Sequence, residues 1–363
     1  DALQKDFGNR DPKSSFLTEI ATTIGVLQHA IKNVDKWTKD EKRPSNVDRP
    51  FFIRMLMGFL GSKSYIKYQP LGTVGVISPW NFPVNLILAP LGGIFAAGNR
   101  AMIKPSELTP ATSEVTKRMF EAYFDKSEAA VFTGDAEVGA AFSALPFDHL
   151  LFTGGTQIGK KVMKAASDNL VPVTLELGGK SPVIVDENAD LSDVAKKVMR
   201  GKTMNAGQIC LAPDYLMLPK GKSEEFAKAS NEAISEMFAD LKYNEDYTSV
   251  INERHYERIN ELVSDAKEKG AEVIQINPAD EDFEQQELHK IPPTLVLNPT
   301  DEMKIMQEEI FGPVLPVKEY EDFDETVNYV NSKDRPLGLY LFSKDKNKEK
   351  KVLDNTTSGG VTL

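Results

Sequence analysis

The chain has 363 residues, of which 41% are hydrophobic and 27% are charged, and this ordinary globular mixture excludes disordered, collagen-like and low-complexity proteins. Lys and Arg number 43 against 54 Asp and Glu, and the net charge of −11 disfavours nonspecific binding to nucleic acids or to anionic membrane surfaces. A chain of this length predicts two or three domains.

The single cysteine, Cys210, excludes an intramolecular disulfide and a cysteine-based zinc site. We therefore expect no metal and a reducing compartment, the cytoplasm. The longest apolar stretch, residues 86–98, is far shorter than the roughly 20 residues that a membrane span needs. The N-terminus has no signal-peptide pattern. The chain opens without Met and stops inside an apolar run, so we expect residues to be missing at both ends.

The first predicted element is a helix over residues 11–38, in which apolar residues recur at three- and four-residue spacing: Phe16, Ile20, Ile24, Leu27 and Ile31. From Thr73 onward, short apolar strands alternate with helices. Strands are predicted at 73–78, 101–104, 130–132 and 149–153, and helices at 84–97, from 110 with Thr109 as N-cap, at 137–144 and up to 166. This alternation predicts an α/β fold with a doubly wound, Rossmann-like parallel sheet, which binds ligands at the carboxyl ends of its strands.

A second cycle of alternating elements begins after Gly178-Gly179. Its predicted strands cover 182–185, 215–218 and 271–276, and its predicted helices cover 191–204, 223–238 and 253–269. We therefore expect two domains, residues 1–178 and residues 179–363.

Two segments at predicted strand ends suggest a nucleotide site, although the chain has no Gly-x-Gly-x-x-Gly pattern and no Walker loop. Residues 152–159 (Phe-Thr-Gly-Gly-Thr-Gln-Ile-Gly) join a strand to a helix, where glycines let a phosphate approach the free backbone N–H groups. A plain tight turn is the alternative. Glu107 lies near the distance at which dinucleotide folds place a ribose-binding carboxylate, and Lys104 precedes it. Alone, this pair is typical of a solvated helix entry, but together the two segments favour a dinucleotide.

Cys210 follows the polar, glycine-containing sequence Asn205-Ala206-Gly207-Gln208-Ile209. A free cysteine is usually a small buried hydrophobic residue. Its place on a polar loop instead favours a reactive thiolate.

Two further residues are candidates for chemistry. Glu176 ends an apolar strand, where apolar surroundings would raise its pKa towards the range of a general base; the alternative is a buried glutamate paired with Lys180. Asn81 lies in a rigid loop between two prolines, and its amide could donate to a developing oxyanion. Taken alone, Asn81 is typical of a hydrogen-bonded loop residue.

Six motifs occur in order along the chain: Pro79-Trp80-Asn81-Phe82-Pro83, Lys104-Pro105-Ser106-Glu107, Phe152-Thr153-Gly154-Gly155, Leu175-Glu176-Leu177-Gly178-Gly179-Lys180, Asn205-Ala206-Gly207-Gln208-Ile209-Cys210 and Glu308-Glu309-Ile310-Phe311-Gly312-Pro313. In this order and spacing the chain resembles the aldehyde dehydrogenase superfamily over nearly its whole length. Residues 210–215 and 336–343 resemble the class 3 and coniferyl aldehyde dehydrogenase branch.

The resemblance implies NAD(P)-dependent oxidation of an aldehyde to a carboxylic acid. Cys210 would form a thiohemiacetal whose oxyanion is held by the Asn81 amide and the Cys210 N–H, and Glu176 would activate the water that hydrolyses the later thioester. The cofactor is expected to be NAD, with NADP possible. Residues 1–178 would be the family's NAD(P)-binding domain and residues 179–363 its catalytic domain. The implied cofactor contacts are Trp80, Lys104, Glu107, Gly154, Gly155, Gly159 and Leu177 in the first domain, and Glu309 and Phe311 in the second.

The resemblance also implies an aromatic or medium-chain aldehyde substrate and a homodimer that uses the strand region at 62–70 when the protein is full length. The chain departs from the family at Gly155, where a serine is usual, and it lacks a Pro-Phe-Gly-Gly segment after Gly360. Two alternatives therefore remain: a catalytically impaired nucleotide-binding fragment, and a cofactor-independent thiol esterase.

Overall fold

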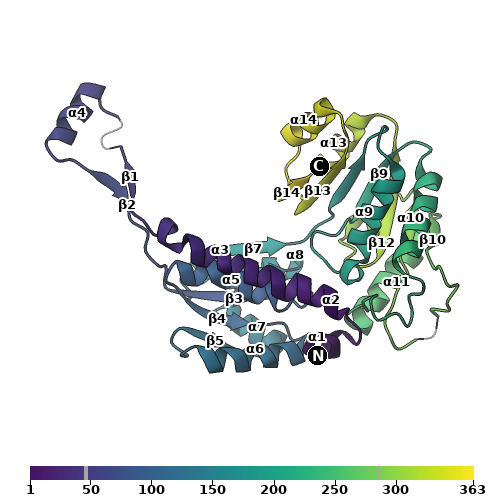
Figure 1. Cartoon of the computed structure of the whole chain (residues 1–363), viewed down its shortest axis with the longest axis horizontal. Helices are drawn as coiled ribbons and strands as arrows, with labels where there is room; N and C mark the ends of the chain where they lie inside the picture. Colours follow the sequence, from purple (N-terminus) through teal and green to yellow (C-terminus); the bar gives the residue numbers. More distant parts are fainter. Residues whose placement is uncertain (45–47, 285) are drawn as a thin grey trace.

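The computed structural model describes residues 1–44, 48–284 and 286–363, which form two sheets and a protruding hairpin (Figure 1). The first sheet has five parallel strands in the order β5-β4-β3-β6-β7. Their bounds are β3 Thr73–Ile77, β4 Arg100–Lys104, β5 Ala129–Val131, β6 His149–Gly154 and β7 Val173–Leu177. The connections reverse direction between β3 and β6, which confirms the predicted doubly wound sheet.

The helices that cross over this sheet are α5 Asn85–Ala96, α6 Pro110–Tyr123, α7 Ala136–Ser143 and α8 Thr156–Ser167. Each predicted boundary agrees with the structure to within one residue. Thr109 is the N-cap residue of α6 and Pro110 begins the helix, as predicted, but the Thr109 side chain makes no capping hydrogen bond. The carboxylate of Asp6 caps the helix instead, accepting the N–H groups of Ala111 at 2.9 Å and Thr112 at 2.8 Å.

The second sheet has seven strands in the order β10-β11-β12-β9-β8-β13-β14, and only β10 runs antiparallel to its neighbour. The strand bounds are β8 Pro182–Val185, β9 Tyr215–Pro219, β10 Glu272–Gln275, β11 Thr294–Leu297, β12 Val314–Tyr320, β13 Gly338–Phe342 and β14 Gly360–Thr362. The helices are α9 Leu191–Thr203, α10 Ser223–Met237, α11 Glu253–Glu268, α12 Lys304–Gln307, α13 Phe323–Asn331 and α14 Lys346–Asn355. The chain enters this sheet just after Gly178-Gly179.

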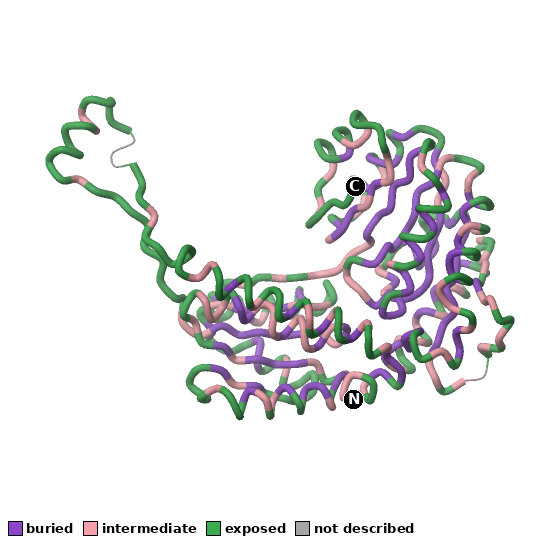
Figure 2. Tube along the Cα trace, viewed as in Figure 1, coloured by how far each residue is buried: buried purple, intermediate pink, exposed green. Residues whose placement is uncertain are grey.

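Buried residues run through the strands of both sheets (Figure 2). Alternate residues of β8 belong to different apolar clusters: Val183 and Val185 pack on one face, and Ile184 packs on the other. Because both faces of β8 are covered, this strand is apolar throughout, as is typical of central strands in parallel sheets.

The two sheets approach each other with opposite strand ends. The carboxyl ends of β3, β4, β6 and β7 lead to Asn81, Glu107, Gly155 and Gly178, whereas the amino ends of β9 and β12 follow the Cys210 and Glu309 loops. All of the chemically interesting motifs therefore belong to loops at these facing ends.

The N-terminal helix is present but packs differently from its apolar pattern. It consists of α2 Pro12–Ser15, a π-helical stretch Phe16–Ala21 and α3 Thr22–Trp37, preceded by α1 Ala2–Phe7. Phe16, Ile20, Ile24 and Ile31 are exposed, whereas Glu19 is buried. Of the predicted apolar face, Leu27 packs against Gly92 of α5, whereas the other four residues face away from the sheet and a charged residue points inward.

A hairpin of β1 Glu41–Arg43 and β2 Ser64–Ile66 extends away from both sheets and carries α4 Phe51–Phe59 near its tip (Figure 1). The strand region predicted to join subunits includes β2. Within the described residues, none of the helices combines the length and the apolar character that crossing a bilayer requires.

Candidate active site

The loop before Cys210 has a strained backbone. Asn205 and Ala206 have φ angles of 49° and 51°, and Gly207 continues the left-handed run at 71°. Such conformations cost non-glycine residues about 1–3 kcal/mol each and persist only where the surroundings determine them. A side chain at Gly207 would collide with the Gly312 carbonyl, so only glycine lets these two loops approach so closely.

Gln208 supplies the compensating contacts, and it is fully buried. Its amide nitrogen donates to the carbonyls of Asn205 at 2.9 Å and Ser249 at 3.1 Å, and its amide oxygen accepts the N–H of Ile251 at 2.9 Å. The side chain thus joins the Cys210 loop to residues 249–251, because a buried amide must satisfy all of its donors and acceptors.

Asn81 lies against this loop, although 129 positions separate it from Cys210 in the sequence. Its buried side-chain nitrogen donates to the Gln208 carbonyl at 3.0 Å, and Asn205 donates back to the Asn81 carbonyl at 3.3 Å. An amide nitrogen carries two hydrogens, so the second remains available to an oxyanion near Cys210.

Cys210 is half-buried, and burial is the main cause that raises its pKa. Nearby negative charge on Glu309, and to a smaller extent on Glu176, raises it further. Hydrogen bonds from the N–H groups of Cys210 and Leu211 to the sulfur act in the opposite direction. The structure thus brings the predicted nucleophile close to two carboxylates, and its resting form is the thiol.

The prediction that Glu176 has apolar surroundings is wrong. The residue is exposed, because β7 is the edge strand of its sheet and alternate residues of that strand face solvent. Its alternative partner is wrong as well, since Lys180 pairs with Asp214.

The carboxylate that burial does affect is Glu309. Burial and the charge of Asp214 raise the pKa of Glu309 to about 7, whereas a hydrogen bond from Gly179 and the cations Lys180 and Arg258 lower it. The carboxylate lies against Gly178, where any side chain would collide with it.

A buried group of charges supports this arrangement and was not identified from the sequence. Lys180 pairs with Asp214 and donates to the carbonyls of Ile305 at 2.7 Å and Glu308 at 3.0 Å. The other carboxylate oxygen of Asp214 accepts the N–H of Ile310 at 2.9 Å. These contacts hold the Glu309 loop against the Cys210 loop. The only sequence signal for the burial of Asp214 is its mostly apolar neighbourhood in residues 210–215.

Lys202 adds a second buried amine near this group. Burial lowers the pKa of Lys202 to about 8, and its amine donates to the Pro213 carbonyl at 2.8 Å.

Trp80 and Phe311, both predicted cofactor contacts, lie together with ring centroids 5.4 Å apart. The structure adds His255 to this cluster, at 5.2 Å from Trp80. Burial, together with Arg258 and Arg254, lowers the pKa of His255 to about 4, so its ring is neutral.

The predicted nucleotide residues occupy the neighbouring strand ends. Lys104 is buried at the end of β4 and pairs with the exposed Glu107 at 3.3 Å. Gly155 precedes the first turn of α8, and a side chain there would meet nothing within 4 Å. Gly159 is buried, and a Cβ there would lie 2.9 Å from Leu177. Gly154 ends β6 and pairs with Leu177 of β7, and a Cβ there would lie 2.7 Å from the Phe152 ring.

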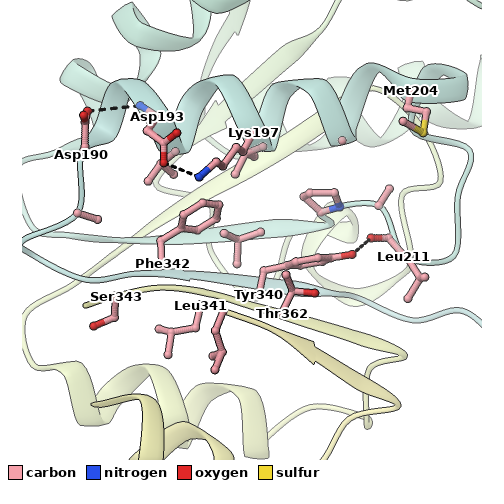
Figure 3. A pocket seen from close by; sticks show the side chains of 18 of the residues that line it. Asp190, Asp193, Lys197, Met204, Leu211, Tyr340, Leu341, Phe342, Ser343 and Thr362 are labelled. Carbon is pink, nitrogen blue, oxygen red and sulfur yellow. Dashed lines mark hydrogen bonds and ion pairs between the residues drawn. The ribbon is translucent and has the colours of Figure 1, made fainter. Parts of the chain in front are cut away.

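A groove of about 870 Å³ lies beside α9 and β13 (Figure 3). Ile209 and Leu211 line it, and the Tyr340 hydroxyl donates to the Leu211 carbonyl, but Cys210 itself is not among the lining residues. The groove is therefore lined by the two residues on either side of the thiol.

Comparison with known proteins gives consistent relatives. Residues 4–363 match the model of the aldehyde dehydrogenase family. The chain is 57% identical to a probable coniferyl aldehyde dehydrogenase of Caulobacter vibrioides, over all of this chain and 73% of that protein.

Solved structures agree with this similarity. The substrate-bound AldH of Staphylococcus aureus has a TM-score of 0.89 and 38% identity, and the match covers 99% of this chain and 75% of that one. The Mycobacterium tuberculosis aldehyde dehydrogenase complexed with NAD+ has a TM-score of 0.85 and 25% identity, covering 99% and 72%.

Proposed function

Because the chain belongs to the aldehyde dehydrogenase family, we propose that the oxidation of an aldehyde to the acid proceeds through covalent intermediates on the sulfur of Cys210, the nucleophile. The protein is an NAD(P)-dependent oxidoreductase that acts on aldehydes. The observation that supports the covalent mechanism is the contact between the Asn81 loop and the Cys210 loop. The Asn81 amide is hydrogen-bonded to the backbone two residues before the chain's single thiol.

The strand ends of the first sheet fit a dinucleotide. The first turn of α8 has free N–H groups and a positive dipole end, and the space at Gly155 lets a pyrophosphate approach the backbone. Lys104 and Glu107 are a donor and an acceptor suited to the two hydroxyls of a ribose. The cofactor is NAD, with NADP as the alternative. When bound, it accepts the hydride that leaves the aldehyde carbon.

The residues of this chain carry out the remaining steps. Loss of the Cys210 proton frees the sulfur to attack the carbonyl carbon, and the free Asn81 hydrogen donates to the oxyanion that forms. After hydride loss the substrate is a thioester on Cys210. Glu176 then takes a proton from the attacking water, a role that suits a carboxylate reachable by solvent. The new C–O bond replaces the C–S bond, so the carboxylic acid leaves and the Cys210 sulfur is released as a thiolate.

We propose the substrate class from the name of the Caulobacter vibrioides relative. An enzyme named for coniferyl aldehyde suggests an aromatic aldehyde here, with medium-chain aldehydes as the next class. We also propose a cytoplasmic location, because the nucleophile is a free thiol that an oxidising compartment would inactivate.

A homodimer is proposed through the hairpin. The helix α4 near its tip exposes Phe51, Phe52, Met55, Leu56 and Phe59. Monomeric proteins rarely leave a contiguous apolar patch of this kind uncovered.

One assay tests the proposal against a thiol esterase and an impaired nucleotide-binding fragment. Reduction of NAD is followed by absorbance with aromatic and aliphatic aldehydes, beside hydrolysis of an activated ester without cofactor. We expect aldehyde-dependent reduction of NAD, fastest with aromatic aldehydes. Ester hydrolysis alone would favour the esterase, and neither activity would favour the fragment.

A further inference from the structure

Residues 6–19, which we call the N-terminal strap, contact both halves of the molecule. Asp6 caps α6 beside the first sheet, as described above. Asn9 donates to the Tyr247 carbonyl at 2.7 Å, and its own carbonyl accepts the N–H of Ser249 at 3.0 Å. The strap therefore spans from the first sheet to the segment that Gln208 binds.

The end of the strap caps the helix that follows the Asn81 loop. Val84, at the start of α5, offers no side-chain cap. Glu19, which is fully buried, accepts the N–H groups of Val84 at 3.0 Å and Asn85 at 2.8 Å. The first-turn donors that every helix leaves unsatisfied are thus bound from 65 residues away.

Arg10 holds the other end of the same loop. Its guanidinium, 3% exposed, pairs with Glu19 at 2.9 Å and lies 5.2 Å from the centre of the Phe82 ring. It also lies 4.5 Å from the centre of the Phe7 ring, whose centre is 6.2 Å from that of the Trp80 ring. The residues before and after Asn81 are both in contact with the strap.

These contacts form a closed ring with the thiol loop. In the strap, the Asn9 carbonyl accepts the N–H of Ser249, and the Ser249 carbonyl accepts from the Gln208 side chain. The Gln208 carbonyl accepts from Asn81, whose neighbours Trp80 and Phe82 lead back to the strap. Within the described residues, this ring fixes the Asn81 amide from both directions.

We propose that Arg10 and Glu19 are positioning residues that set the place of the Asn81 amide relative to Cys210. The proposal rests on the oxyanion role of Asn81 in the proposed function. A buried ion pair contributes little net stability compared with apolar packing, so its main consequence here is geometric. Donors to an oxyanion act only at the right distance, and a displacement of about 1 Å is enough to slow a reaction strongly.

The test measures the first-turnover rate of NADH formation by stopped flow, beside NAD affinity and thermal stability. Arg10→Lys keeps the charge but loses the planar contact with Phe82. We expect a first-turnover rate lower by about tenfold with unchanged NAD affinity. Asp6→Asn is the matched control, because it weakens a helix cap made by the same strap without touching the Asn81 loop. Its rate should stay within about twofold of the parent.

A double-mutant cycle separates positioning from general stability. In an Asn81→Ala background, Arg10→Lys should change the rate by less than about twofold, since the group that it positions is gone. Additive losses, or a lower melting temperature with an unchanged rate, would overturn the proposal. An Asn81→Ala variant with the parent's rate would overturn the oxyanion role and this proposal together. If Arg10→Lys does not fold, Arg10→Met combined with Glu19→Gln removes both charges, and the same outcomes apply.

Discussion

The two sides of the candidate site differ in how they are held. On the thiol side, Asn81, Gln208 and Asp214 are buried, and each is hydrogen-bonded to another part of the chain. On the cofactor side, Glu107 and Glu176 are exposed, and Gly155 faces open space. The first side is packed and the second is open.

The difference indicates where binding energy is used. A packed side has its donors placed before any ligand arrives, which is how enzymes stabilise developing charge without reorganisation. An open side keeps its donors and acceptors free for a ligand. Substitutions on the packed side should therefore change turnover, and those on the open side should change cofactor affinity, with Glu176 as the expected exception.

The largest effect is expected for Cys210→Ala. Without the sulfur neither a thiohemiacetal nor a thioester forms, so both aldehyde oxidation and ester hydrolysis should fall to background. NAD affinity, measured by fluorescence titration, should be unchanged because the open side is intact. Dehydrogenase turnover that survives in this variant would exclude the covalent mechanism, since the chain has no other thiol.

Glu176→Gln tests whether this exposed residue on the open side changes turnover. The amide cannot take a proton from water, so steady-state turnover should fall by roughly 10²–10⁴ while the thioester still forms. Stopped-flow absorbance should show a rapid burst of NADH followed by slow release. Loss of the burst itself would mean that Glu176 acts earlier, by deprotonating Cys210.

Glu309 sharpens the description of the packed side. Its ionised carboxylate raises the pKa of Cys210, so Glu309→Gln should make alkylation by iodoacetamide roughly threefold faster at pH 8. Glu308→Gln is the control, since Glu308 is the exposed neighbour. An alkylation profile that is identical in both variants would contradict the interaction.

The raised pKa of Glu309 also predicts how the free energy of unfolding changes with pH. The pKa of Glu309 is raised from 4.5 to about 7, so between these values the folded chain binds more protons than the unfolded chain. Its contribution to the free energy of unfolding is therefore present at low pH and is lost as pH rises through 7. Urea titrations from pH 5 to 8 should show a smaller decline for Glu309→Gln than for the parent.

The smallest effect is expected on the open side. A 2′-phosphate would meet the like charge of Glu107, although exposure and Lys104 weaken the repulsion. Glu107→Gln should therefore improve NADP affinity by about three- to tenfold relative to NAD. Glu114→Gln, an exposed change on α6, is the control. A parent that prefers NADP, or an unchanged ratio in Glu107→Gln, would show that Glu107 does not contact the ribose.

Local pattern was sufficient for the elements and the motifs. The spacing of apolar residues predicted the strands and helices that it named, up to residue 276, to within one residue, because period and turn chemistry depend on near neighbours. It predicted neither α1, the hairpin with α4, nor the elements after residue 276. The motif that ends at Cys210 identified the thiol for a similar reason, as a polar loop between two apolar segments is visible in the sequence itself.

Pairing across the fold was not predictable in this way. Glu176 was expected to be buried, but whether a strand lies at the edge of a sheet depends on which strand pairs with it. Asp6 caps a helix that begins 104 positions later, Lys180 pairs with Asp214 instead of Glu176, and Glu19 turns inward while its apolar neighbours face solvent. The sequence by itself determined the alternation of elements, the fold class and the motif that contains the proposed nucleophile. Only the tertiary structure decided which charges are buried and which loops meet, because those contacts join residues that no local period relates.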